Sequence, residues 1–264
     1  MRLEEKGMPV RVKSLLLALL LTAACTSETT GAPPLEARAP DPPQAAAIRA
    51  VPADRWRAVL IAGDNNSPAF DNGVEALRDK LAERGVRDIR ILTSDPGANP
   101  SVPVATATNV SSALRTAGGE ACLAFITSHG DKNGVALRAA KGFVNPATLA
   151  SAIDAGCGAR PTVVIVSACH SGIFLTNAMR QPNRVVLTAA SADRVSFGCG
   201  AGDKYTYYDQ CLLEEFDRAA TWRQLAQATR SCVESLEQSM GVSPPSQPQV
   251  FVGAAVNDLR IPGR

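Results

Sequence analysis

Two short stretches of the sequence place reactive side chains at the ends of buried strands. The run VVIVSACHSG (163–172) carries Cys169 three residues after four β-branched residues, and the run FITSHG (125–130) carries His129. Open α/β sheets bind ligands at the carboxyl ends of their strands, so a thiol and an imidazole that meet there could perform nucleophilic catalysis. Cys169 could equally be a small core residue, because free cysteine is among the most buried residue types.

The two stretches together favour catalysis over packing. A right-handed crossover between the two strands would make them neighbours in the sheet. The thiolate is the reactive form of cysteine, and a nearby imidazole favours it. Gly130 would let the backbone approach a substrate closely and offer its N–H to a developing oxyanion.

The rest of the chain predicts the α/β framework that would position these residues. Apolar runs indicate strands at 55–63, 88–94, 122–130, 161–169, 183–191 and 247–256. Amphipathic stretches indicate helices at 72–85, 107–118, 145–156, 205–219 and 222–240. Continuous apolar strands that alternate with helices are typical of a mostly parallel sheet covered on both faces. We therefore expect a three-layer α/β/α sandwich.

The N-terminal part of the chain predicts export. Residues 1–24 combine a basic head with the apolar run SLLLALLLTAA, which is typical of a secretory signal peptide and too short to span a bilayer. The run leads directly to Cys25 and resembles the lipobox of bacterial lipoproteins, which predicts a lipid-modified Cys25 and a protein anchored at the periplasmic or cell-envelope face of a bacterial membrane. Ordinary cleavage that yields a soluble secreted protein is the alternative. Residues 25–53 are rich in Pro and Ala and predict a tether, followed by a domain at 54–264.

The motifs of this domain resemble a known family. The blocks AFITSHG and VVIVSACHSG are similar to the paired His-Gly and Ala-Cys blocks of legumain and caspase-like cysteine peptidases, in particular the bacterial legumain-like branch. The blocks VLIAGDNN…FDN, SADRVSFGCG…YTYYDQ and QPQVFVG support the resemblance, which spans residues 55–256. It implies a caspase-like sandwich, a Cys–His dyad, a peptide or protein substrate and no cofactor.

The resemblance assigns roles to individual positions. Cys169 matches the family nucleophile, His129 matches the family histidine, and Gly130 matches the oxyanion glycine that acts with the backbone N–H of Cys169. His170 stands where the family tolerates several residues and is expected in a loop or pocket wall. The implied reaction is hydrolysis of peptide bonds through a covalent acyl-enzyme, and transfer of the acyl group to an amine is the alternative. A non-catalytic peptide-binding module on the same fold is a further alternative.

Four positions depart from the family pattern. Ser128 and Ser167 stand where legumains have acidic residues, and Asp71 aligns with a pocket arginine. An asparagine that orients the histidine in legumains aligns near Ala69, and Asn65 or Asn66 could take its place. If Asp71 lines the first specificity pocket with Ser167, its carboxylate favours a cationic side chain before the scissile bond. Alternatively, Asp71 simply lies at a helix start, where a carboxylate satisfies orphan N–H groups.

Charge and motifs argue against other functions. Without residues 1–24, the chain holds 23 basic and 23 acidic side chains, which gives no sign of a nucleic-acid footprint. The chain lacks a Cys-x-x-Cys pair for disulfide exchange, a Gly-Lys-Ser/Thr phosphate loop and a G-x-S-x-G serine elbow. Two histidines without an H-E-x-x-H motif predict no metal site.

The cysteine count limits the disulfides. Seven cysteines less Cys25 and Cys169 leave five, so at most two internal bridges can form among them in an oxidising compartment. Cys122 opens one predicted strand and Cys157 lies just before another, which places both at the same sheet edge. We favour this pair, and Cys211 with Cys232 on successive helices is the next candidate. Several of these cysteines could instead be core residues.

Overall fold

The computed structural model describes residues 48–264, apart from residues 96, 98, 99 and 117. The predicted signal peptide, the predicted lipid site at Cys25 and most of the predicted tether lie outside the described residues. Within the described residues, no helix has the length and apolar character that a membrane crossing requires.

The last residues assigned to the tether pack against the folded domain. The backbone N–H of Ile48 donates to the carbonyl of Ala255 at 2.8 Å, and the Trp56 indole donates to the carbonyl of Val51 at 3.2 Å. The side chains of Ile48 and Val51 lie against the hydrophobic core. These two apolar residues bury surface against the core, so the fold includes Ile48 and the residues that follow it.

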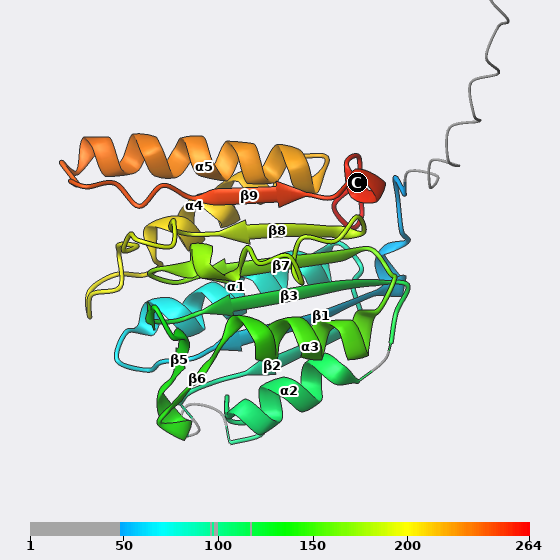
Figure 1. The fold of residues 1–264 in the computed structure, drawn as a ribbon, viewed down its shortest axis with the longest axis horizontal. Coiled ribbons are helices and arrows are strands. Elements are labelled where there is room, and N and C mark those ends of the chain that lie inside the picture. Colours follow the sequence, from blue (N-terminus) through cyan, green and yellow to red (C-terminus); the bar gives the residue numbers. More distant parts are fainter. Residues whose placement is uncertain (1–47, 96, 98–99, 117) are drawn as a thin grey trace, which may run out of the picture. The chain divides into compact units, whose positions relative to one another are not determined.

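A six-stranded sheet forms the middle of the domain, and its strand order is β2-β1-β3-β7-β8-β9 (Figure 1). The strands are β1 (Trp56–Ala62), β2 (Asp88–Leu92), β3 (Ala121–Thr127), β7 (Thr162–Ser167), β8 (Arg184–Thr188) and β9 (Gln249–Val252). All neighbours pair in parallel except β9, which runs antiparallel to β8. The sheet is mostly parallel, as the sequence predicts.

Helices cover both faces of the sheet and complete three layers. One face carries α1 (Pro68–Glu83), α4 (Tyr207–Phe216) and α5 (Trp222–Ser239), and the other carries α2 (Ala107–Arg115) and α3 (Pro146–Cys157). Short 3-10 helices lie at Ala53–Arg55, Arg138–Ala140, Ser171–Phe174 and Ala254–Val256. This arrangement confirms the predicted α/β/α sandwich.

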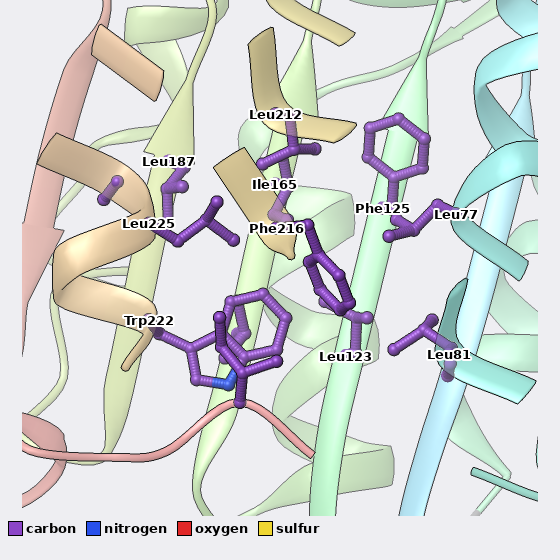
Figure 2. Close-up of a cluster of buried hydrophobic side chains, with 14 of the residues drawn as sticks. Leu77, Leu81, Leu123, Phe125, Ile165, Leu187, Leu212, Phe216, Trp222 and Leu225 are labelled. Carbon is purple, nitrogen blue, oxygen red and sulfur yellow. The ribbon is translucent and has the colours of Figure 1, made fainter. Parts of the chain in front are cut away.

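The alternation of side chains along β3 shows why the strands read as continuous apolar runs. Leu123 and Phe125 face α1 and α4, as Figure 2 shows, whereas Ala124 and Ile126 belong to the core on the opposite face. Because both faces are covered, every position of the strand is buried. Full burial of each large apolar side chain stabilises the fold by roughly 1.5–3 kcal/mol.

The part of the chain between β3 and α3 forms a small antiparallel sheet, which was not predicted from the sequence. It consists of β4 (Gly130–Asp131), β5 (Gly134–Leu137) and β6 (Gly142–Val144), in that order. These strands are two to four residues long. Strands this short do not show the sustained alternation by which a sequence indicates a strand.

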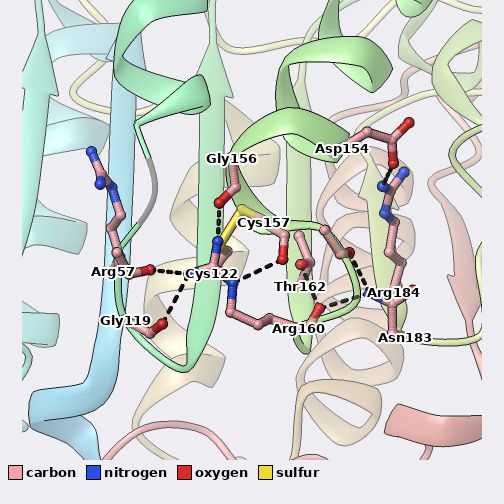
Figure 3. Close-up of a disulfide and its surroundings, with 12 residues drawn as sticks. Arg57, Gly119, Cys122, Asp154, Gly156, Cys157, Arg160, Thr162, Asn183 and Arg184 are labelled. Atoms are coloured by element: carbon pink, nitrogen blue, oxygen red, sulfur yellow. Dashed lines mark hydrogen bonds and ion pairs between the residues drawn. A yellow bond between two sulfur atoms is a disulfide. The ribbon is translucent and has the colours of Figure 1, made fainter.

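The favoured disulfide and the next candidate are both present. Cys122 pairs with Cys157 at the edge where β3 and β7 begin, and Cys211 pairs with Cys232 between α4 and α5 (Figure 3 shows the first bridge). Arg160 surrounds the first bridge with hydrogen bonds, because its guanidinium donates to the carbonyls of Gly118 and Gly119 and its Nε donates to that of Cys157. The bridge therefore ties the entry of β7 to the start of β3.

We expect the Cys122–Cys157 bridge to contribute about 2–4 kcal/mol to the free energy of unfolding, because it closes a loop of 35 residues in the unfolded chain. The double variant Cys122→Ala/Cys157→Ala should therefore unfold at a lower urea concentration than the unmodified domain. Cys199→Ala, which removes a free thiol and no bridge, is the control. Equal urea midpoints for the double variant and the unmodified domain would contradict this assignment.

Candidate active site

The pairing of β3 with β7 brings the two predicted catalytic residues to the same edge of the sheet. The strands are parallel, and their register pairs Thr127 with Ser167. His129 follows Thr127 by two residues, and Cys169 follows Ser167 by two residues. Both residues therefore leave the sheet at its carboxyl edge, the position at which α/β sheets bind ligands.

His129 and Cys169 line one cavity. Its volume is about 10 Å³, room for roughly one water molecule. The lining residues are Phe70, Ser128, His129, Ser167, Ala168, Cys169, Ser196, Phe197, Cys199 and Thr206. A peptide side chain does not fit into this volume, so a substrate has to widen the cavity as it binds.

The turn that carries Cys169 is held against the segment that follows β8. The Cys169 sulfur accepts a hydrogen bond from the Ser196 N–H at 3.2 Å and lies 3.5 Å from the Ser196 carbonyl. His170 adopts a left-handed backbone conformation (φ 58°), its N–H donates to the Arg194 carbonyl at 2.7 Å, and its ring contacts the Ala192 carbonyl at 3.0 Å. His170 is thus a loop residue that shapes the turn, and it does not line the cavity.

Packing and one backbone hydrogen bond fix the position of His129. Its carbonyl accepts from the Ala136 N–H at 2.8 Å, which connects it to the small sheet. Its ring meets the edge of the Phe70 ring with centroids 5.1 Å apart. Phe70 belongs to the first turn of α1, whose start is capped by the Ser67 side chain and occupied by Pro68. In the described part of the chain, the His129 ring has no hydrogen-bond partner, so the aromatic contact sets its orientation.

Gly130 approaches the backbone of Cys169 so closely that no side chain fits there. A Cβ atom at position 130 would lie 2.5 Å from the Cys169 carbonyl oxygen and 2.9 Å from the Cβ atom of Ala168. The structure therefore brings together the three residues expected to act in catalysis, and the small sheet that begins at Gly130 holds that segment in place.

Asp71 lies elsewhere. Its carboxylate accepts a hydrogen bond from the Thr93 hydroxyl at 2.6 Å and lines a separate cavity next to the end of β2. Burial raises the pKa of Asp71 above its usual value. The geometry of the helix explains this placement. Phe70 faces His129, and the next residue on an α-helix is rotated by about 100°, so the Asp71 side chain points away from His129. Asp71 is thus in the first turn of α1 and outside the cavity that contains Cys169.

Ser167, which the family resemblance assigns to the specificity pocket, lines the same cavity as Cys169. It ends β7, lines the cavity, and its hydroxyl oxygen is 3.4 Å from that of Thr206. Thr206 caps the start of α4 by accepting from the Asp209 N–H at 3.0 Å.

Sequence reasoning missed Asp209, which lies beneath these two hydroxyls. It is fully buried, and its Oδ2 accepts from the Thr127 hydroxyl at 2.6 Å, while its Oδ1 has no hydrogen-bond partner. Burial raises the pKa of Asp209 to about 6, and the hydrogen bond from Thr127 and the nearby hydroxyls of Ser167 and Thr206 oppose this rise. An acidic residue in the first turn of a helix is ordinary in a sequence, so nothing in the sequence around it signals this role.

Cys199 is a second free thiol in the same cavity. Burial, followed by the proximity of Cys169, raises the pKa of Cys199, so it stays protonated and is a poor nucleophile. Within the described residues, no group of three or more His, Cys, Asp or Glu side chains is placed to hold a metal ion.

Comparisons with known proteins identify a family and a fold for this chain. The model of the peptidase C13 family matches residues 105–241, which include His129 and Cys169. None of the curated proteins matches the sequence. Among solved structures, caspase-1 from Spodoptera frugiperda is similar in fold, with a TM-score of 0.55 and 14% sequence identity over 81% of this chain and 93% of that chain.

We expect Asp209→Asn to raise the stability of the domain at neutral pH by roughly 1–3 kcal/mol. The pKa of Asp209 is raised from 3.8 to about 6 in the folded state, so the folded state binds the proton more tightly than the unfolded state. Its contribution to stability is therefore largest at acidic pH and is lost as the pH rises from about 4 to about 6. Urea unfolding of both proteins at a series of pH values measures the difference.

Asp217→Asn is a control with the opposite sign. Hydrogen bonds and charge from Lys80 and Arg84 lower the pKa of Asp217, so its contribution is present at neutral pH and is lost on acidification. A neutral-pH stability of Asp209→Asn below that of the unmodified protein would contradict an unpaired buried carboxylate at this site.

Proposed function

Since the chain belongs to the peptidase C13 family, we propose that this cysteine peptidase is an endopeptidase in which Cys169 is the nucleophile and His129 is the general acid. Cysteine peptidase activity follows from the family. The residue assignment rests on one observation, the register of β3 and β7, which delivers both residues to one cavity. The contact between Gly130 and the Cys169 backbone supports it.

The proposed reaction begins when the Cys169 thiolate attacks the carbonyl carbon of the scissile peptide bond. The carbonyl oxygen becomes an oxyanion, and the backbone N–H groups of Gly130 and Cys169 stabilise it. As the C–N bond breaks, His129 donates a proton to the leaving amine. The product of this step is a thioester between Cys169 and the N-terminal half of the substrate.

A water molecule then hydrolyses the thioester. It attacks the same carbonyl carbon, His129 accepts one of its protons, and the second tetrahedral intermediate releases the new carboxylate and the Cys169 thiolate. In the free protein the Cys169 sulfur is bonded to the Ser196 backbone.

The variant Cys169→Ala should have no measurable peptidase activity. The kcat of His129→Ala should be about 10²–10⁴-fold lower than that of the unmodified protein, because proton transfer to the leaving group is lost. Activity is measured as cleavage of a mixed peptide library by the purified protein. Both variants should keep the urea midpoint of the unmodified protein.

His170→Asn is the matched control, since asparagine tolerates the left-handed backbone conformation of this position. It should keep most of the activity. Cleavage by Cys169→Ala, or unchanged activity in His129→Ala, would refute the dyad.

We also propose that the protein is exported and anchored to a bacterial membrane through a lipid on Cys25. The signal-like residues 1–24 and the small residues before Cys25 support this proposal. The two disulfides add support, because such bridges persist in oxidising compartments such as the periplasm.

The variant Cys25→Ala, expressed in a bacterial host, should move from the membrane fraction to the soluble fraction, because it cannot carry the lipid. Mass spectrometry of the mature protein checks the modification directly and should show a lipid-modified N-terminal cysteine. A mature protein that begins elsewhere and carries no lipid would rule out the anchor.

A further inference from the structure

Asp209 is a buried carboxyl group without a cationic partner. No ion pair to Asp209 exists among the described residues, and its Oδ1 has no hydrogen-bond donor. Glu237, the other buried carboxyl group without a cationic partner, instead receives the backbone N–H of Ser246 at both oxygens. Burying an unpaired carboxylate is costly, so the position of Asp209 requires an explanation beyond packing.

The surroundings of Asp209 connect it to the active site. Its hydroxyl neighbours end the two strands that carry the dyad, since Thr127 precedes His129 by two residues and Ser167 precedes Cys169 by two residues. Ser167 and Thr206 both line the cavity that contains Cys169. Helix α1 packs against another side of the Asp209 carboxyl group, because a Cβ atom at Gly73 would lie 3.0 Å from Oδ2. The carboxyl group thus lies directly behind the two hydroxyls of the cavity wall.

We propose that Asp209, with the hydroxyls of Ser167 and Thr206, forms the floor of the pocket for the residue before the scissile bond and selects lysine or arginine there. This inference rests on the proposed function, because it assigns a substrate class to the same site.

The chemistry of this floor suits a cationic guest. The hydroxyls of Ser167 and Thr206 can accept hydrogen bonds from an ammonium or guanidinium group while they donate to the carboxylate. A guest cation would also supply the missing counter-ion in a water-poor environment, where charge pairs are strong. An asparagine guest leaves the carboxylate without a counter-ion, and an aspartate guest is repelled by it.

The walls of the cavity suit the stem of such a side chain. Phe70 and Phe197 line the cavity and offer apolar faces to the methylene groups of lysine or arginine. Phe197 lies in the segment that follows β8, which has no helix or strand between Ala189 and Thr206. Ser196 in this segment contacts the Cys169 sulfur, so a movement of the segment that widens the pocket would also release the sulfur from Ser196.

Asp71 is a rival for the same specificity, and the structure separates the two. Asp71 bonds to Thr93 and lines a different cavity, whereas Asp209 lies beneath the cavity of Cys169. A substitution at each position therefore tells which carboxylate selects the substrate.

The test uses fluorogenic peptides that differ only in the residue before the scissile bond, which is arginine, citrulline, lysine or asparagine. Citrulline has nearly the shape of arginine and no charge. For the unmodified protein, kcat/KM for the arginine peptide should exceed that for the citrulline peptide by about tenfold or more. Asp209→Asn should bring this ratio close to one and still cleave the citrulline peptide.

Two further variants make the result decisive. Asp71→Asn should keep the arginine-to-citrulline ratio of the unmodified protein. Ser167→Val removes the hydroxyl and keeps a residue that suits the end of a strand. It should lower the arginine-to-citrulline ratio of kcat/KM. This variant decides the question if Asp209→Asn fails to fold. A ratio that survives both Asp209→Asn and Ser167→Val, or one lost in Asp71→Asn alone, would overturn the proposal.

The outcomes also separate this inference from the proposed function. Cleavage that depends on Cys169 but is faster after asparagine than after arginine overturns the selection by Asp209 and leaves the dyad standing. Absence of Cys169-dependent cleavage of every peptide, including a mixed library, overturns both.

Discussion

The parallel pairing of β3 with β7 is the constraint on which the rest of the site depends. Its register places Thr127 beside Ser167, the last residues of the two strands, and His129 and Cys169 follow them two residues later in the chain. A slip of one residue would turn Leu123 and Phe125 away from α1 and α4 and expose the wrong side chains to each core. The core therefore fixes the register, and the register brings the thiol and the imidazole to one cavity.

The same pair of strands is held at both ends. At the entry edge, the Cys122–Cys157 disulfide joins the start of β3 to the segment before β7, and Figure 3 shows Arg160 bound across it. At the carboxyl edge, Thr127 and Ser167 converge on the buried carboxyl group of Asp209. The second attachment differs from the first, because it places an unpaired polar group where apolar packing would be more stable. Sites that bind or react commonly give up stability in this way.

The sequence predicts the features that follow from long apolar runs and from strand adjacency. The strands, the helices, the neighbouring positions of His129 and Cys169 just after β3 and β7, and the Cys122–Cys157 disulfide belong to this class. The Cys211–Cys232 disulfide follows from two successive helices. The small sheet after β3 escapes prediction because its strands are too short to show a period. The direction of the Asp71 side chain depends on the rotation of α1, and the role of Asp209 depends on contacts with residues at distant positions in the sequence, so neither can be read from local patterns.

The narrow cavity that contains Cys169 is bounded by strands of the core and by a segment without regular structure. The strands that carry Cys169 and His129 are fixed by the core, whereas the wall formed by Ser196 and Phe197 belongs to a segment without helix or strand. Ser196 bonds the Cys169 sulfur, so widening the cavity on this side breaks the contacts between Ser196 and the sulfur. Displacement costs the hydrogen bonds of Ser196, and a side chain that pairs with Asp209 would offset that cost. A guest without a charge gains less, so the same carboxylate would govern both which side chain binds and how readily the site opens.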